Sequence, residues 1–485
     1  MDKDKKPIIL RRFDKGVITD DDVIDPYLAP KNSCALAINM NFDKLGAAKV
    51  RGGLAIVGAQ ISSNLILGLY QFVDAGTGTA SALITVVTTV LYTLETATWT
   101  SKLTGLTTGL KARFTTFLDY VFFTNGTDAV RTWDGGGGAF GTTNAGSAPT
   151  GKYIERFKNR VWIASTATYP SRLFFSSLPS TDATPVITWT STDYIEISPS
   201  DGEDVTALRR FDRNLFVFKK SFCYPVYSKD QTEPDPLITV GTHSQESVVV
   251  AKDGMYWHHP SGIYRLRRGE GQPKEISRPI YDIIRNVAYG SYDDVASWSD
   301  DDHVFFSVGD VTYNNLTISN CVIRWTISTE VWTIYSYSEK ITVGARFDTG
   351  ASGGYTAGTA VSRVVGSTVG RVFTVDSGTT DNTSPIHYQF DTQWWDGGSR
   401  SLIKRISKVN LLSKDMVGAK VSYRSDRDTE NVFKPIGSVL KFNEVFDNQI
   451  IEGTRIKLNV SGVSSTTAPV FSGFEILDYD LIPLK

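Results

Sequence analysis

One hairpin pattern recurs along the middle of the chain and limits the possible folds more than any other feature. Each copy has a short polar turn and then a run of large apolar residues, as in "NRVWIAS" at 159–165 and "RNLFVF" at 213–218. The residues that precede these turns recur at intervals of 40 to 54 positions, at Phe117, Phe157, Phe211, Ala251 and Trp298. A repeat of this length, with about four strands in each copy, is typical of propeller blades.

The composition favours strands over helices. Aromatic residues make up 12% of the chain and glycines number 41, whereas there are only 4 methionines. Aromatic residues suit pleated sheets and glycines suit tight turns. The apolar runs are nearly continuous, as expected for strands that neighbouring blades cover on both faces. We therefore expect an all-β protein with a β-propeller of six or seven blades at 61–385; a set of unrelated sandwich hairpins is the alternative.

The pattern changes after about residue 385 to an alternation of apolar and polar residues. In "TRIKLNVSG", Ile456, Leu458 and Val460 fall on one face of a strand, and Lys457 falls on the other. Alternation of this kind is typical of antiparallel strands that are half-buried. We therefore expect residues 386–485 to form a C-terminal β-sandwich.

One segment has the pattern of a helix. In "ISRPIYDIIRN", Ser277 is a candidate cap, Pro279 falls in the first turn, and Ile280, Ile283 and Ile284 share one face. Proline is well tolerated in the first turn of a helix. The sequence predicts a short amphipathic helix packed on a blade edge.

The first 60 residues differ from the rest of the chain. Single apolar residues stand among charged residues, prolines and glycines, and such a segment cannot bury enough surface by itself. We expect residues 1–60 to form an extended N-terminal arm and a lead-in strand. Four residues of the arm are candidates for contacts with a neighbouring subunit: Phe13, Ile18, Tyr27 and Leu28.

Charge and cysteine content exclude several kinds of protein. The net charge is −2, from 50 basic and 52 acidic residues, so no overall positive field attracts nucleic acid strongly. Three widely spaced cysteines, Cys34, Cys223 and Cys321, indicate a reducing compartment rather than a disulfide framework. The most apolar stretch, at 81–94, is too short to cross a bilayer, so we expect no membrane anchor.

The motifs that resemble catalytic or ligand sites lack the context that their chemistry needs. A phosphate-loop spacing ends at Lys152, but Tyr153 stands where a hydroxyl ligand for magnesium is expected. Ser352 lies in a Gly-x-Ser-x-Gly pattern within a Gly-rich loop, without the strand-to-helix turn of a nucleophile elbow. His258 and His259 are adjacent on a predicted strand and point to opposite faces. We predict no enzyme activity, no cofactor site and no metal site.

Several segments, taken in order along the chain, resemble one protein family. They are "RFDKGVITDDDVIDPYLAP" with "NMNFDKLGAAKVRGG" in the N-terminal segment, "FKNRVWIAS", "DVTALRRFDRNLFVFKKS", "GMYWHHPSGIYRL" and "GFEILDYDLI". The chain resembles the tail hub or nozzle proteins of short-tailed bacteriophages, of the packaged-DNA stabilisation type. Five residues of the N-terminal segment stand at corresponding places: Gly16, Pro30, Asn39, Arg51 and Gly53.

The resemblance implies a structural protein of the virion tail, made in the cytoplasm of the host bacterium. It implies a ring of six copies below the portal and its adaptor protein, around the channel through which the genome is retained and ejected. Tail fibre or tail-needle proteins would be neighbours, and DNA would make transient contacts without sequence specificity. A near-neutral chain suits such a conduit, because many phosphate contacts would hold the DNA back. The alternatives are a receptor-binding or capsid-decorating propeller, and a glycan-processing propeller enzyme with two carboxylates in a pocket.

Overall fold

The structure is a computed structural model that describes residues 7–483 apart from residues 12, 20–31, 45, 74–80, 96, 181–186, 349–360, 429–431, 448–449 and 465. Nearly all of the regular structure is β-strand. Within the described part of the chain, α1 (Tyr281–Ile284) is the one α-helix. The predicted all-β class is thus confirmed.

Five small antiparallel sheets follow one another between residues 66 and 275. Their strands are β6 Ile66–Val73, β7 Ser81–Val87, β8 Val90–Glu95 and β9 Thr98–Leu103; β10 Arg113–Phe117, β11 Tyr120–Thr124 and β12 Arg131–Trp133; β13 Gly151–Phe157, β14 Arg160–Thr166, β15 Arg172–Phe175 and β16 Tyr194–Glu196; β17 Ala207–Phe211, β18 Asn214–Phe218 and β19 Cys223–Val226; and β20 Val249–Val250, β21 Gly254–His259, β22 Gly262–Arg267 and β23 Lys274–Glu275.

Two further groups of four strands continue the series within a larger sheet. One consists of β24 Ala296–Ser299, β25 His303–Tyr313, β26 Leu316–Thr326 and β27 Val331–Ser336. The other consists of β28 Ile341–Asp348, β29 Val361–Ser367 and β30 Val372–Val375, completed by β5 Leu54–Ile56 from the N-terminal part of the chain.

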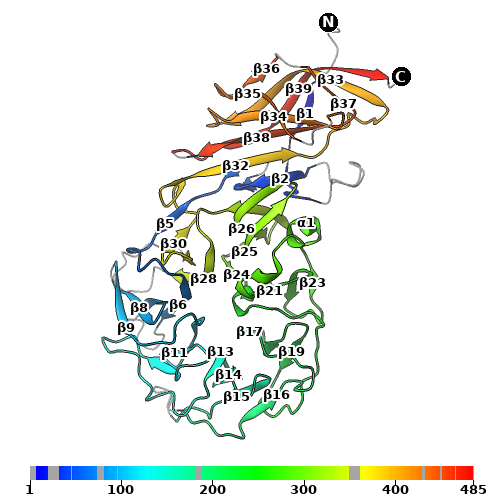
Figure 1. Ribbon diagram of the computed structural model, residues 1–485. Helices are drawn as coiled ribbons and strands as arrows, with labels where there is room; N and C mark the ends of the chain where they lie inside the picture. The colour runs from blue at the N-terminus through cyan, green and yellow to red at the C-terminus, as the bar shows by residue number, and fades with distance from the viewer. Residues whose placement is uncertain are drawn as a thin grey trace.

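All of these groups are arranged around a common centre (Figure 1). Residues of β6, β10, β13, β17, β24 and β28, the first strands of their groups, line one cavity at that centre. Strand β28 packs against both β24 and β6, so the last group returns to the first. We call this arrangement, residues 54–56 and 66–375, the ring.

The repeated hairpins occupy equivalent positions in the ring, as the sequence predicts. The apolar strands that follow four of the repeated turns are β11, β14, β18 and β21, and each is the second strand of its sheet. In the turn between β13 and β14, Lys158 and Asn159 have φ angles of 47° and 54°. Two positive φ angles are the mark of a two-residue turn whose twist matches that of the flanking strands.

The predicted helix is present, although it is short. It comprises a 3₁₀ turn at Arg278–Ile280 and then α1, and it buries Ile280, Ile283 and Ile284. Ser277 makes no capping hydrogen bond to the helix; instead, its hydroxyl accepts a hydrogen bond from the amide of Ile263.

The C-terminal residues form two sheets that pack face to face, with a shared apolar core. One contains β1 Ile8–Leu10, β3 Met40–Lys44, β4 Ala47–Val50, β33 Leu402–Lys414, β36 Val445–Phe446, β37 Ile451–Gly453 and β39 Val470–Pro483. The other contains β32 Ser384–Thr392, β34 Lys420–Ser425, β35 Lys434–Ser438 and β38 Ile456–Ser464. Two further strands, β2 Cys34–Ile38 and β31 Thr380–Asp381, pair with β32. We call these paired sheets the sandwich.

Strand β38 differs from the prediction of a half-buried strand. Ile456, Leu458 and Val460 are buried as expected, but Lys457 is also buried, at 3% exposure. Lys457 lies with Tyr313 and other residues of the long β25–β26 hairpin around one cavity beside β38. The local alternation of β38 gives no sign of this burial, because the residues around Lys457 include Tyr313 and Trp394 from other parts of the chain.

The N-terminal segment is built into both halves of the molecule. Strand β2 pairs in parallel with β27 of the ring and antiparallel with β32 of the sandwich, and β5 pairs with β30. Strands β2 to β5, within the residues 1–60 that we expected to form an extended arm and a lead-in strand, are therefore strands of the sandwich and the ring. One sheet runs without a break from β24 through β2 to β35.

Candidate functional site

Phe13, the first of the predicted contact residues, is packed inside the sandwich. It is 6% exposed, and its ring centroid lies 4.5 Å from that of Phe390 and 5.7 Å from that of Phe471. The apolar surface that we expected on a neighbouring subunit is thus supplied by this chain.

Ile18 also contacts this chain. It is half-buried, its amide donates to the carbonyl of Cys34, and its carbonyl accepts a hydrogen bond from the side chain of Gln393. The other two predicted contact residues, Tyr27 and Leu28, lie outside the described residues.

A buried ion pair holds the segment between β4 and β5. The guanidinium of Arg51 binds both carboxylate oxygens of Asp381 at 2.7 Å, and both side chains are almost fully buried. Its Nε donates to Asn39 at 2.7 Å, and the group lies 4.1 Å from the ring centroid of Tyr337. Resemblance had singled out Arg51 and Asn39, but only the structure reveals Asp381 as the partner.

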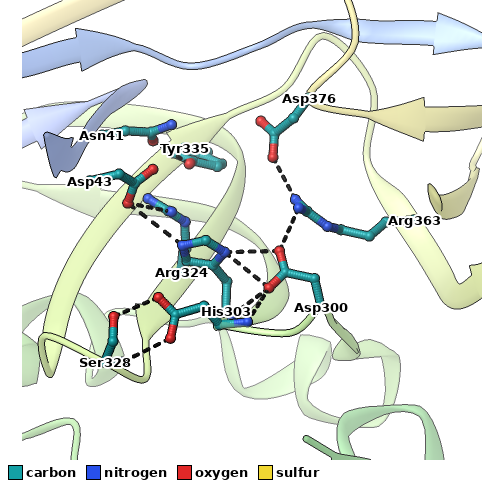
Figure 2. A network of polar contacts seen from close by, with 10 residues as sticks. Asn41, Asp43, Asp300, His303, Arg324, Ser328, Tyr335, Arg363 and Asp376 are labelled. Atoms are coloured by element: carbon teal, nitrogen blue, oxygen red, sulfur yellow. Dashed lines mark hydrogen bonds and ion pairs between the residues drawn. The ribbon is translucent and has the colours of Figure 1, made fainter. Parts of the chain in front are cut away.

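A second polar network lies where β3 of the sandwich meets the ring (Figure 2). The guanidinium of Arg324, on β26, lies 2.7 Å from the carboxylate of Asp43, on β3. His303, at the start of β25, has Nε2 3.6 Å from Asp43 and Nδ1 2.8 Å from Asp300. The imidazole thus stands between two carboxylates, one from each half of the molecule.

The network continues through Arg363 on β29. Its guanidinium lies 2.6 Å from the carboxylate of Asp300 and 2.7 Å from that of Asp376, which follows β30 (Figure 2). Three carboxylates and three basic side chains therefore alternate across two groups of the ring and one strand of the sandwich.

This arrangement shifts the pKa values of its members. Burial alone would raise the pKa of Asp43, but hydrogen bonds from His303 and Arg324 lower it to about 2. Burial would lower the pKa of His303, yet its hydrogen bonds to Asp300 and Asp43 raise it above the usual value. Both shifts favour the charged forms, so the network stabilises the junction through charge.

Among the described residues of the sandwich, seven large apolar side chains between residues 417 and 463 are exposed to solvent. We call them the apolar edge: Val417, Val432, Leu440, Phe442, Val445, Ile450 and Val463. Leu440 is 76% exposed and Phe442 is 65% exposed. Among the described strands, β35 pairs only with β34, and β36 only with β33, so both present an unpaired edge. Unpaired strand edges beside apolar side chains favour association with another chain.

A cavity of about 590 Å³ adjoins the apolar edge. Val417 and Val463 line it together with Leu316 and Ile318 of the β25–β26 hairpin and Tyr388 of β32. Two residues of the apolar edge therefore lie beside the junction of the sandwich with the ring.

The motifs that resemble catalytic sites lie in ordinary structural positions. Tyr153 is buried on β13, with the guanidinium of Arg113 over its ring at 4.5 Å. His258 and His259 alternate on β21, and burial lowers the pKa of His258 to about 3 and that of His259 to about 4. Ser352 lies outside the described residues.

The described residues offer neither a metal-binding cluster nor a membrane-spanning helix. No three His, Cys, Asp or Glu side chains in that part of the chain are placed to hold a metal ion. No helix in the same residues is long and apolar enough to cross a membrane.

Comparison with known proteins reveals no family. No family model matches the chain, and no curated protein matches it. The extracellular domain of a protein described as a hybrid two component system from B. thetaiotaomicron aligns with 8% identity and a TM-score of 0.45, over 66% of this chain and 39% of that one. YCF48 bound to D1 peptide aligns with 10% identity and a TM-score of 0.40, over 69% and 96%. At these values neither similarity bears on function.

Proposed function

We propose that the chain is a structural protein of a bacteriophage tail. Several copies of the chain assemble into a closed circular oligomer, which is distinct from the ring of sheets within each chain. The observation that carries the proposal is the apolar edge, where exposed side chains such as Leu440 and Phe442 stand beside unpaired strands. The sequence resemblance to tail hub and nozzle proteins supplies the context. In that context the partner on the apolar edge is a second copy of this chain.

The place proposed for this assembly is the virion tail, below the portal and its adaptor. Six copies would surround the exit channel, in contact with the adaptor above and with fibre or needle proteins below. A net charge of −2 supports a conduit role, because DNA that makes few phosphate contacts can slide.

We also propose that the ring of sheets is a β-propeller of seven blades. Five separate sheets and two four-stranded groups of the larger sheet support this number. The last blade takes its outer strand, β5, from the N-terminal part of the chain. Closure by strands from distant parts of the chain would resist opening of the propeller under load.

The continuous sheet between ring and sandwich supports a load-carrying role. Strand β2 bridges β27 and β32, and the networks around Arg51 and His303 cross the same junction. Backbone hydrogen bonds and buried charges at one junction disfavour hinge motion, which suits a part of a rigid tube.

The alternative of a glycan-processing enzyme finds little support in the carboxylates at the ring centre. Glu155 and Glu246 line the same cavity there. Glu246 forms an ion pair of 3.0 Å with Arg113. Burial would raise the pKa of Glu246, but Arg113 and Lys111 lower it. A general acid for glycoside cleavage needs a raised pKa.

The proposed association can be tested with paired substitutions in the apolar edge. The double variant Leu440→Asp with Phe442→Asp should weaken self-association by about 30-fold or more, since the loss of even one central apolar contact costs about 2 kcal/mol. The control is Leu178→Asp, which changes an apolar side chain of the ring that is 55% exposed. Light scattering coupled to size-exclusion chromatography measures the mass of each species.

Equal masses for the two variants and the unmodified chain would contradict the proposed surface. A trimer, or a monomer at all concentrations, would favour the receptor-binding or capsid-decorating propeller instead.

A further inference from the structure

A cavity of about 380 Å³ lies at the centre of the ring and collects charged side chains from several sheets. Arg113, Glu155 and Arg209 reach it from β10, β13 and β17, Glu246 from the segment before β20, and Arg346 from β28. A few polar groups that converge on one concave site are the usual mark of a ligand site.

Two of these charges satisfy each other. The guanidinium of Arg113 pairs with the carboxylate of Glu246 at 3.0 Å and also lies over the ring of Tyr153. This pair contributes no net charge to the cavity. What remains is a positive balance from Arg209 and Arg346 against Glu155.

Arg209 and Arg346 have no ion-pair partner among the described residues. The Nε of Arg209 is buried and has no hydrogen-bond partner in that part of the chain. A buried donor without an acceptor is costly, so such groups usually have a ligand, an ion or water as a partner. Two arginine side chains without an ion-pair partner in the described part of the chain thus line the cavity.

A second cavity lies beside this site. It has a volume of about 460 Å³ and shares Arg209, Ser297 and Arg346 with the central cavity. Its outer part is lined by Lys252 and Asp301, among other residues. The two cavities thus meet at Arg209 and Arg346.

We propose that the ring centre binds phosphate between Arg209 and Arg346, with Glu155 accepting a hydrogen bond from a protonated phosphate oxygen. The planar fork of a guanidinium matches the oxygens of a phosphate group. A carboxylate repels an anion unless that anion carries a proton to donate. Inorganic phosphate carries such a proton near neutral pH and phosphomonoesters carry one below about pH 6, whereas sulfate and the phosphodiesters of DNA do not. The site does not depend on the proposed tail function.

Isothermal titration calorimetry of the full chain with inorganic phosphate tests the site. Arg346→Gln and Arg209→Gln should each weaken phosphate binding at least tenfold. Arg213→Gln, at an exposed position outside both cavities, should leave it unchanged. Glu155→Gln should remove the preference for phosphate over sulfate. A nucleoside monophosphate that binds more tightly than phosphate would identify a phosphomonoester as the ligand, and weaker binding would identify the free ion.

Three results would overturn the proposal. The first is that the unmodified chain does not bind phosphate at millimolar concentration. The second is that it binds phosphate and sulfate equally, and the third is that Arg346→Gln binds phosphate as tightly as the unmodified chain. Arg346 is exposed, so its replacement should leave the fold intact, and circular dichroism confirms that. The result for Arg346→Gln therefore decides the question even if Arg209→Gln fails to fold.

Discussion

Arg51 illustrates how one side chain fixes the path of a long segment. It leaves β4, turns inward and meets Asp381, more than 300 residues away in the chain, at 2.7 Å. Its guanidinium also donates hydrogen bonds to the carbonyls of Gly52 and Ser336. A buried guanidinium with this many acceptors holds the chain in place between the sandwich and the ring.

Arg51→Ala should lower the free energy of unfolding by about 3–5 kcal/mol, because the buried carboxylate of Asp381 would lose its counter-charge. Urea unfolding followed by tryptophan fluorescence measures the loss. Arg11→Ala is the matched control, since Arg11 is 45% exposed in its pair with Glu475 and a pair at the surface should contribute less than about 1 kcal/mol. Similar losses for both variants would show that the buried pair has no special role.

His303 makes the junction sensitive to pH. The pKa of its imidazole is raised in the folded chain, so its stabilisation is complete below about pH 6.5, the unfolded value, and is lost as the pH rises through the folded value. Asp43 acts in the opposite direction: its pKa falls from 3.8 to about 2, so its stabilisation is lost as the pH falls toward 2. The two contributions are both complete between about pH 4 and 6.5.

The melting temperature of His303→Gln should therefore lie furthest below that of the unmodified chain between about pH 4 and 6.5, and closer to it at pH 9. The quantity to compare at each pH is the difference in melting temperature between His303→Gln and the unmodified chain. Burial lowers the pKa values of His258 and His259, and their stabilisation is instead lost as the pH falls below about 6.5. A difference that is constant with pH would show that His303 does not titrate within the network.

Few of these residue-level features could be predicted from sequence. The strand positions of Tyr153 and of the adjacent His258 and His259 follow from local patterns, because alternation along a strand needs no knowledge of distant segments. The partners of Arg51 and His303 depend on contacts between segments hundreds of residues apart. Phe13 stands among charged residues in sequence, and nothing local indicates that Phe390 and Phe471 enclose it.

At the scale of elements, β5 closes the ring. It leaves the sandwich after β4 and pairs with β30, so the N-terminal part of the chain completes the last group of strands. Gly53, just before β5, lies against the backbone of Thr380, where a Cβ atom would stand 1.9 Å from the carbonyl oxygen. The close approach of these two backbones requires glycine.

Gly53→Ala should destabilise the chain by about 1–3 kcal/mol, because the added methyl group forces the two backbones apart. Thermal unfolding measures the change, and limited proteolysis should reveal faster cleavage near residues 54–56. Gly137→Ala is the control, because a Cβ atom there would meet no atom within 4 Å. Unchanged stability in Gly53→Ala would mean that β5 tolerates separation from its neighbour.

Elements could be predicted better than their pairing. The hairpins and the short helix follow from periodicity and turn residues, which act within a few positions. The roles of β2 and β5 could not be predicted in this way, because each pairs with strands near residues 334–392. The burial of Lys457 on β38 could not be predicted for the same reason.

At the scale of the whole molecule, the chain combines a closed ring of sheets with a sandwich that is continuous with it (Figure 1). The apolar edge lies on the sandwich, and the charged cavity lies at the ring centre. The two surfaces are separate, so self-association and phosphate binding should be independent of each other. Disruption of the apolar edge should leave phosphate affinity unchanged.

Electron microscopy of the purified chain in negative stain tests the central claim most directly. The proposal of a tail hub predicts closed rings with a central hole, built from six copies, which Leu440→Asp with Phe442→Asp should convert to single particles. Single particles of the unmodified chain at all concentrations, or assemblies without a closed axis, would contradict it.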